Sequence, residues 1–162
     1  MTDTIIFDLD GTLLNTLEDL TDSVNHTMEQ YHLPVHTIEE IRTYVGNGAA
    51  KLIERAVPQG RDNSAYDEIL DAFRKHYQVH CEDKTGPYEG VIDMLAELRQ
   101  AGYRMAIVSN KPDGAVKQLF GKYFGAYVQA AIGEHPGAEK KPAPDMVLQA
   151  LAELSSDALH AV

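Results

Sequence analysis

The sequence has one cysteine, few basic residues and no long apolar run, and each shortage argues against a class of protein. Because Cys81 stands alone, it cannot form an internal disulfide, so the fold does not depend on a disulfide framework. With 14 basic against 25 acidic residues the net charge is -11, which argues against nucleic acid or an anionic membrane as a partner. No apolar run approaches the roughly 18 residues of a membrane-spanning helix.

The start of the chain also lacks a secretion signal, since residues 1–7 are too short and too polar at their beginning. We therefore expect a cytoplasmic protein. A length of 162 residues with 44% hydrophobic residues predicts a globular chain with room for one core and a small inserted subdomain. An anionic substrate would need a local positive site on such an acidic protein.

Short apolar runs alternate with helical apolar spacing in most of the chain. The runs predict strands at residues 5–7, 105–108, 127–132 and 158–162. The helical spacing predicts helices over residues 91–98, 116–123 and 147–154. This alternation predicts an α/β fold with a doubly wound parallel sheet.

Residues 16–85 interrupt the alternation with a helical insertion. Apolar spacing predicts helices at 17–31 and 64–81, and Thr37 with Glu40 forms the signature of a capping box. The expected division is a core domain of residues 1–15 and 86–162 and an inserted helical subdomain of residues 16–85.

Two carboxylates follow the first predicted strand, in the run Asp8-Leu9-Asp10-Gly11-Thr12. Ligands of open parallel sheets bind at this edge. Asp8 is suited to attack phosphorus and form an aspartyl-phosphate, and Asp10 to protonate the leaving alcohol and then activate water. Such hard oxygen ligands also suit Mg2+. The alternative is an acidic turn that caps a helix.

Residues that suit a phosphate follow the later strands. Ser109 and Asn110 can offer a hydroxyl and backbone N–H groups to phosphate oxygens, and Lys141, in the run Lys140-Lys141-Pro142, can supply a positive charge. The alternatives are that Ser109 only caps the helix after Pro112, and that the lysines form a solvated helix entrance.

In this order, the residues resemble the haloacid dehalogenase-like hydrolase superfamily, and the run from Lys140 to Asp145 resembles its phosphoglycolate phosphatase branch. The resemblance implies a phosphatase acting on a small phosphorylated metabolite with Mg2+. In it, Asp8 is the nucleophile and a metal ligand, and Asp10 is the acid/base and a ligand through its carbonyl. Ser109 and Lys141 bind phosphate, and Thr12 helps to set the loop. The helical insertion stands at this branch's cap position.

Within that insertion, the glycine-bearing run 44–48 precedes an apolar helix. In this branch similar loops face the active site, and the glycines Gly46 and Gly48 would let the backbone approach a substrate. Asn47 and Lys51 are the expected determinants of substrate choice. The alternative is a simple turn between helices.

The resemblance also implies a later acidic pair that completes the Mg2+ site, and the chain ends before it. We therefore keep a rival hypothesis, in which an incomplete or decayed enzyme binds phosphorylated ligands or a partner without turnover. An unfinished sheet edge would favour homo-oligomers. A receiver domain is a further alternative, which the helical insertion argues against.

A zinc site is the last alternative, because His76 and His80 share one face of a predicted helix and Cys81 follows directly. No other histidine has a matching spacing. A solvated helix face explains the pattern better.

Overall fold

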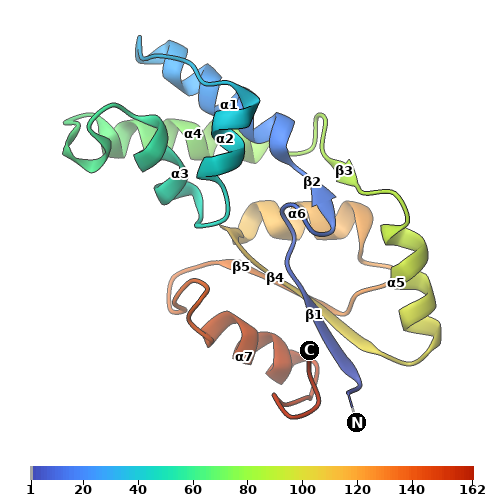
Figure 1. Cartoon of the computed structure of the whole chain (residues 1–162). Coiled ribbons are helices and arrows are strands. Elements are labelled where there is room, and N and C mark those ends of the chain that lie inside the picture. Colours follow the sequence, from blue (N-terminus) through green and yellow to red (C-terminus); the bar gives the residue numbers. More distant parts are fainter. Residues whose placement is uncertain (1) are drawn as a thin grey trace. The chain divides into compact units, whose positions relative to one another are not determined.

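The computed structural model describes residues 2–162, and the chain divides into two compact units (Figure 1). The first consists of Met1–Asn15 and Pro87–Val162 and is called the core unit here; the second is Thr16–Gly86, the helical unit. The short strands β2 (Leu14–Asn15) and β3 (Gly86–Pro87) pair with each other where the chain passes from one unit to the other.

The core unit is built on a three-stranded sheet in the order β1-β4-β5. These strands span Thr4–Phe7, Arg104–Pro112 and Ala130–Glu134. Both pairings are parallel, with Ile6 opposite Ala106 and Val108 opposite Ile132. The central strand β4 is buried along almost its whole length, which explains its apolar sequence.

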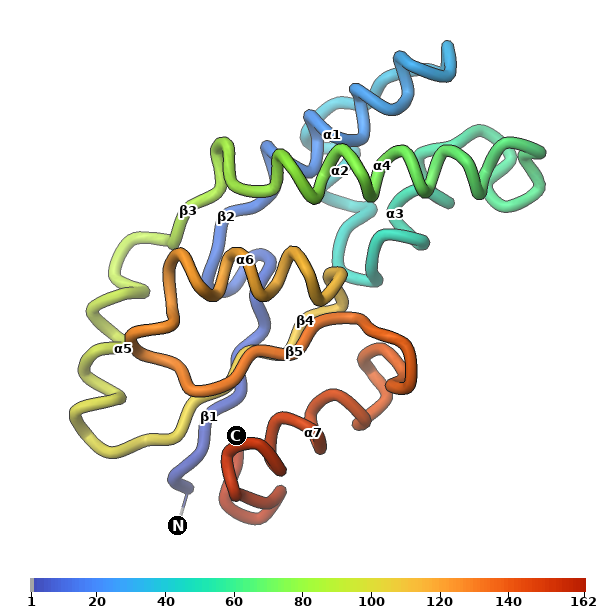
Figure 2. The backbone as a smooth tube through the Cα atoms, turned by 180° about the vertical axis from the view of Figure 1, so that it is seen from behind, coloured from blue at the N-terminus to red at the C-terminus, as the bar shows by residue number. Residues whose placement is uncertain are grey.

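Helices cover both faces of this sheet. The three helices of the core unit are α5 (Val91–Gln100), α6 (Asp113–Tyr123) and α7 (Asp145–Glu153). Figures 1 and 2 show α6 and α7 on opposite sides of the sheet. On the α7 side, Met146 and Ala150 pack in one apolar cluster with Ala106, Val108 and Ile132. The predicted α/β fold with a doubly wound parallel sheet is therefore confirmed.

Two of the predicted strands differ from the structure. β5 begins at Ala130, because the backbone N–H groups of Tyr127 and Val128 both donate to the carbonyl of Phe124 in a turn that follows α6. The run 158–162 is not a continuous strand. Only Ala161 forms a parallel bridge, to Thr4, on the edge of β1 that β4 leaves open. Association of copies through that edge stays a prediction.

The helical unit contains α1 to α4 and a short 3-10 helix. Their bounds are Leu17–Gln30, Ile38–Tyr44, Ala49–Ala56, Gly60–Asp62 (the 3-10 helix) and Tyr66–His80. Its core includes the fully buried side chains of Met28, Ile53 and Phe73. The predicted capping box is confirmed: Thr37 accepts from the backbone N–H of Glu40, whose carboxylate accepts from that of Thr37.

Among residues 2–162, no helix is both long and apolar enough to cross a membrane.

Candidate active site

Asp8 lies directly after β1, at the carboxyl end of the sheet. Its Oδ1 atom accepts a hydrogen bond of 2.8 Å from the backbone N–H of Leu9. The chain then turns at Gly11, whose φ of 76° is in the region that glycine adopts without strain. The backbone N–H groups of Thr12 and Leu13 donate to the carbonyl of Leu9 and close the loop. The sequence therefore places both carboxylates in a tight turn at the ligand-binding edge.

Lys141 brings a positive charge to Asp8 from the loop between β5 and α7. Its Nζ atom lies 2.8 Å from Asp8 Oδ1 and donates a second bond of 2.8 Å to the carbonyl of Val108 on β4. The Asp8 side chain is 48% exposed and that of Lys141 27%, so both remain accessible to a ligand. The expected role of Lys141 in binding phosphate stays a prediction.

Asp10 is contacted by two residues of β4. The Nζ atom of Lys111 lies 2.9 Å from Asp10 Oδ1, and Ser109 Oγ donates to Asp10 Oδ2 at 3.3 Å. Ser109 Oγ also accepts from the backbone N–H of Lys111. Ser109 does not cap α6, which has Pro112 at its N-cap and no side-chain cap bond. Its role in binding phosphate stays a prediction.

Lys111 was not among the predicted site residues, although it is the most enclosed charge at this edge of the core unit's sheet. Its side chain is only 3% exposed, against 21% for Asp10. A charge buried to this degree needs a partner of opposite sign. The available signal was its position, directly after Ser109-Asn110 at the end of an apolar strand.

The side-chain amide of Asn110 forms hydrogen bonds with the backbone of Lys141. Its Oδ1 accepts from the backbone N–H of Lys141 at 2.8 Å, and its Nδ2 donates to the carbonyl of Lys141 at 3.1 Å. The predicted contribution of Asn110 to phosphate binding therefore stays a prediction for its backbone N–H group, because the amide is engaged elsewhere.

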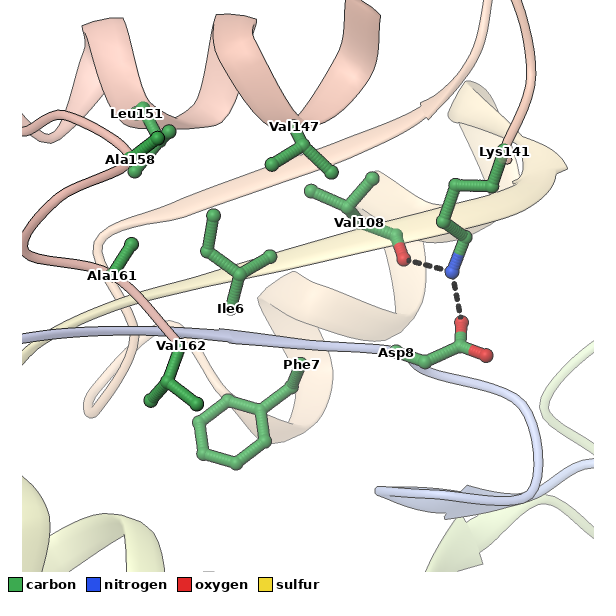
Figure 3. Close-up of a pocket in the computed structure, with 10 residues that line it drawn as sticks. All are labelled: Ile6, Phe7, Asp8, Val108, Lys141, Val147, Leu151, Ala158, Ala161 and Val162. Atoms are coloured by element: carbon green, nitrogen blue, oxygen red, sulfur yellow. Dashed lines mark hydrogen bonds and ion pairs between the residues drawn. The ribbon is translucent and has the colours of Figure 1, made fainter. Parts of the chain in front are cut away.

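A pocket of about 440 Å³ in the core unit opens beside this site. Figure 3 shows Asp8 and Lys141 together at one end of it. The other eight lining residues are apolar and come from β1, β4, α7 and the last residues of the chain, among them Ile6, Val147 and Val162. The charged end would hold an anionic group, and the rest offers an apolar wall.

The other predicted site residues lie elsewhere in the two units. Thr12 is exposed on the loop after Asp10. Gly46, Asn47 and Gly48 connect α2 to α3 in the helical unit, and both glycines have positive φ, 107° and 84°. Lys51 on α3 makes an ion pair of 2.5 Å with Glu54. Their role in substrate choice stays a prediction.

The oxygen donors at the site suit Mg2+ in kind. The Asp8 carboxylate and the backbone carbonyl of Asp10 are hard ligands of the type that hold Mg2+ together with substrate phosphate and water. Among residues 2–162, however, no group of three or more His, Cys, Asp and Glu side chains is placed to hold a metal ion. The described residues would therefore supply few of the ligands of a magnesium ion.

The same finding argues against zinc at the histidines of α4. His76 stacks on His26 with ring centroids 4.0 Å apart and on His80 at 4.3 Å. Cys81 is buried, with its Sγ atom 4.0 Å from the carbonyl of Gln78. The Nδ1 atoms of His76 and His80 instead lie 3.0 Å from Ser23 Oγ and 2.7 Å from Asp83 Oδ2.

Known proteins similar to this chain include phosphoglycolate phosphatases. The chain is 35% identical to the phosphoglycolate phosphatase of Mesorhizobium japonicum over 98% of its own length and 71% of that protein. It is 35% identical to that of Pseudomonas syringae pv. tomato over 86% of its length, and there it spans about half of the relative, 53%.

The fold is likewise shared with a solved structure. A protein of Lactobacillus delbrueckii subsp. bulgaricus superposes with a TM-score of 0.90 at 33% identity, covering 97% of this chain and 75% of the other. The sequence pattern of one family matches residues 5–162, which is almost the whole chain. The chain belongs to the haloacid dehalogenase-like hydrolase family.

Proposed function

We propose that this protein hydrolyses a small phosphate monoester of the phosphoglycolate type through an aspartyl-phosphate at Asp8. The observation that carries the proposal is the contact of 2.8 Å between Lys141 Nζ and Asp8 Oδ1 at the carboxyl end of the sheet. A nucleophilic carboxylate beside a fixed cation is what attack on a phosphate dianion needs, because the cation offsets the repulsion between the two anions. The curated relatives add support, since they are phosphoglycolate phosphatases.

The residues divide the reaction between them. An Asp8 carboxylate oxygen attacks phosphorus, the bond from phosphorus to the ester oxygen breaks, and Asp10 gives its proton to the leaving alcohol. Asp10 then takes a proton from water, whose oxygen attacks the phosphorus of the aspartyl-phosphate and releases orthophosphate and free Asp8. Lys141, the Ser109 hydroxyl and the backbone N–H of Asn110 would hold the phosphoryl oxygens.

The Asp8 carboxylate and the Asp10 carbonyl would hold Mg2+, as expected from the family. When bound, the ion would supply positive charge to the phosphoryl oxygens. A small substrate is consistent with the pocket of about 440 Å³, in which Asp8 and Lys141 are the charged lining residues and the others are apolar. We assign the choice among phosphate esters to Asn47 and Lys51.

The test is turnover of phosphoglycolate and of an aryl phosphate by the purified chain with Mg2+. Asp8→Asn removes the nucleophile, so we expect turnover to fall by at least about a thousandfold. Asp93→Asn is the matched control, because Asp93 is exposed in the first turn of α5 and should leave the rate unchanged. Equal activity of Asp8→Asn and the unaltered chain would eliminate Asp8 as nucleophile.

A second function has a specific observation in its favour. Residues 2–162 hold no cluster of three metal-binding side chains, which leaves few protein ligands for Mg2+. We propose as the second function that the chain binds a phosphorylated ligand at Lys141 and Ser109 without turning it over. Calorimetric binding of phosphoglycolate, with no release of orthophosphate over hours in saturating Mg2+, would select this function over hydrolysis.

A further inference from the structure

The amide of Asn110 and the backbone of Lys141 form a closed pair of hydrogen bonds. One bond runs from Lys141 N–H to Asn110 Oδ1 (2.8 Å) and the other from Asn110 Nδ2 to the Lys141 carbonyl (3.1 Å). The two residues are 31 positions apart in the sequence, so this pair connects β4 to the loop before α7. A primary amide suits this arrangement because its carbonyl oxygen accepts and its NH2 group donates, so one side chain can bond both backbone groups of one residue.

The same strand also fixes the other end of Lys141. The ammonium group donates to the carbonyl of Val108, two residues before Asn110 on β4, while it contacts Asp8. Asn110 is itself buried, at 7% exposure, and lies between Val108 and Pro112, where the register of β4 with β5 shifts. Residues of β4 thus bond both the backbone of Lys141 and its ammonium group.

We propose that Asn110 is a positioning residue that sets Lys141 against Asp8. Without the amide, the loop between β5 and α7 loses its anchor to β4, and the flexible lysine side chain can place its charge away from the nucleophile. Asn110 would therefore act on phosphate through Lys141 and not through its own side chain. The part of this inference that concerns phosphate rests on the proposed function.

The helical unit contains a matched control. Asn25 makes the same pair of bonds with the backbone of His36, at 2.8 Å for each bond. Asn25→Ala therefore removes an equivalent amide clamp from a different part of the chain. Any loss of stability that follows from removing such a pair of amide hydrogen bonds, wherever it lies, is measured in this variant too.

The first measurement does not depend on turnover. Nuclear magnetic resonance would follow hydrogen exchange of the Lys141 backbone N–H and the signal of its ammonium group. In Asn110→Ala we expect the amide to exchange faster, by at least about fivefold, because two hydrogen bonds are lost. We also expect the ammonium signal to shift, whereas Asn25→Ala should leave both unchanged. An unchanged Lys141 in Asn110→Ala overturns the inference, whether or not the chain is a phosphatase.

The second measurement is a double-mutant cycle with inorganic phosphate as the probe. Asn110→Ala should weaken phosphate binding by about fivefold or more in the unaltered chain and by much less in Lys141→Met, since the effect passes through Lys141. Equal weakening in both backgrounds would overturn the inference, because Asn110 would then contact phosphate directly. Absence of phosphate binding by the unaltered chain counts against the proposed function, and Lys141 exchange then decides the positioning role alone.

Discussion

At the scale of single residues, the site is organised as two contacts between a lysine and an aspartate. Lys141 pairs with Asp8, and both side chains reach solvent; Lys111 pairs with Asp10 and is almost fully buried. A chain with a net charge of -11 thereby presents positive charge where an anionic substrate would bind. The difference in burial agrees with the proposed division of labour, since the nucleophile must be reached by substrate and the acid/base must be held in place.

A residue-scale prediction concerns the histidine stack of the helical unit. Burial, followed by the charges of His26 and His80, lowers the pKa of His76 below its ordinary value of 6.5, and the smaller effects of Asp83 and Asp22 oppose this. The remaining neighbour, Ser23 on α1, bonds to His76 Nδ1 at 3.0 Å. Because the pKa of His76 is lower in the folded state than in the unfolded state, the contribution of His76 to the free energy of unfolding is fully present above pH 6.5. That contribution is lost as the pH falls below 6.5.

The measurement is urea unfolding of the helical unit, monitored by residue-resolved spectroscopy between pH 5 and pH 7.5. His76→Gln should flatten the decline of the unfolding free energy toward low pH. His32→Asn is the control, because His32 is exposed and its φ of 54° suits asparagine. An identical pH dependence in His76→Gln and the unaltered chain would refute the role of His76.

At the scale of elements, the packing of β5 against α6 depends on a glycine. The backbone N–H of Gly133 donates to Asp113 Oδ1 at 2.8 Å, where α6 begins. A Cβ atom at Gly133 would lie 2.5 Å from Asp113 Cα and 2.8 Å from the carbonyl oxygen of Lys111. Neither atom can yield without moving the backbone that carries Lys111 into the site.

Gly133→Ala should therefore cost about 1–3 kcal/mol of unfolding free energy, as expected for an overpacked core. Gly121→Ala is the matched substitution on α6: it meets nothing within 4 Å, and it should stabilise by roughly 0.4–1 kcal/mol through helix propensity and the unfolded chain. Denaturant titration of both variants checks this, and a stable Gly133→Ala would show that β5 and α6 can separate easily.

The sequence predicted a structural feature well where the contacts that form it lie within one helix or turn. The capping box at Thr37 appeared as expected because its bonds join residues only three positions apart. β5 was misplaced because the apolar Tyr127 and Val128 suggest a strand, while their backbone N–H groups bond back to Phe124. β4 was longer than its apolar run, since Ser109 to Lys111 are polar residues buried by contacts with Asp10 and Lys141.

At the scale of the whole molecule, each of the two units has its own apolar core. Phe73 in the helical unit is 1% exposed, and Phe124 in the core unit is fully buried. Replacing a buried phenylalanine by alanine costs about 3–5 kcal/mol. Because the two cores are built from different segments, we expect each substitution to destabilise mainly the unit that contains it.

Hydrogen exchange of buried amides in each unit provides the measurement. Phe73→Ala should accelerate exchange in α1 and α4, and Phe124→Ala in β4 and β5, with little effect on the other unit. Acceleration of both units to the same degree by either variant would show instead that the chain unfolds as one cooperative body.

The sequence by itself determined the class of fold and the two ends of the site. A carboxylate pair after a buried strand, and a lysine before a later helix, must meet at the carboxyl edge of a parallel sheet, whatever the details of packing. The periodicity of the apolar residues similarly determined which segments are helices, because that pattern is local.

Only the tertiary structure decided which partner each polar group finds. Lys141 meets Asp8 across 133 positions, the Asn110 amide meets the Lys141 backbone across 31, and Lys111 turns inward to Asp10. These contacts depend on the order and register of β1, β4 and β5, which bring distant segments together to within hydrogen-bond distance. No pattern within one segment carries that information, because hydrogen bonding between side chains is fixed by the position of the strands in space and not by their spacing along the chain.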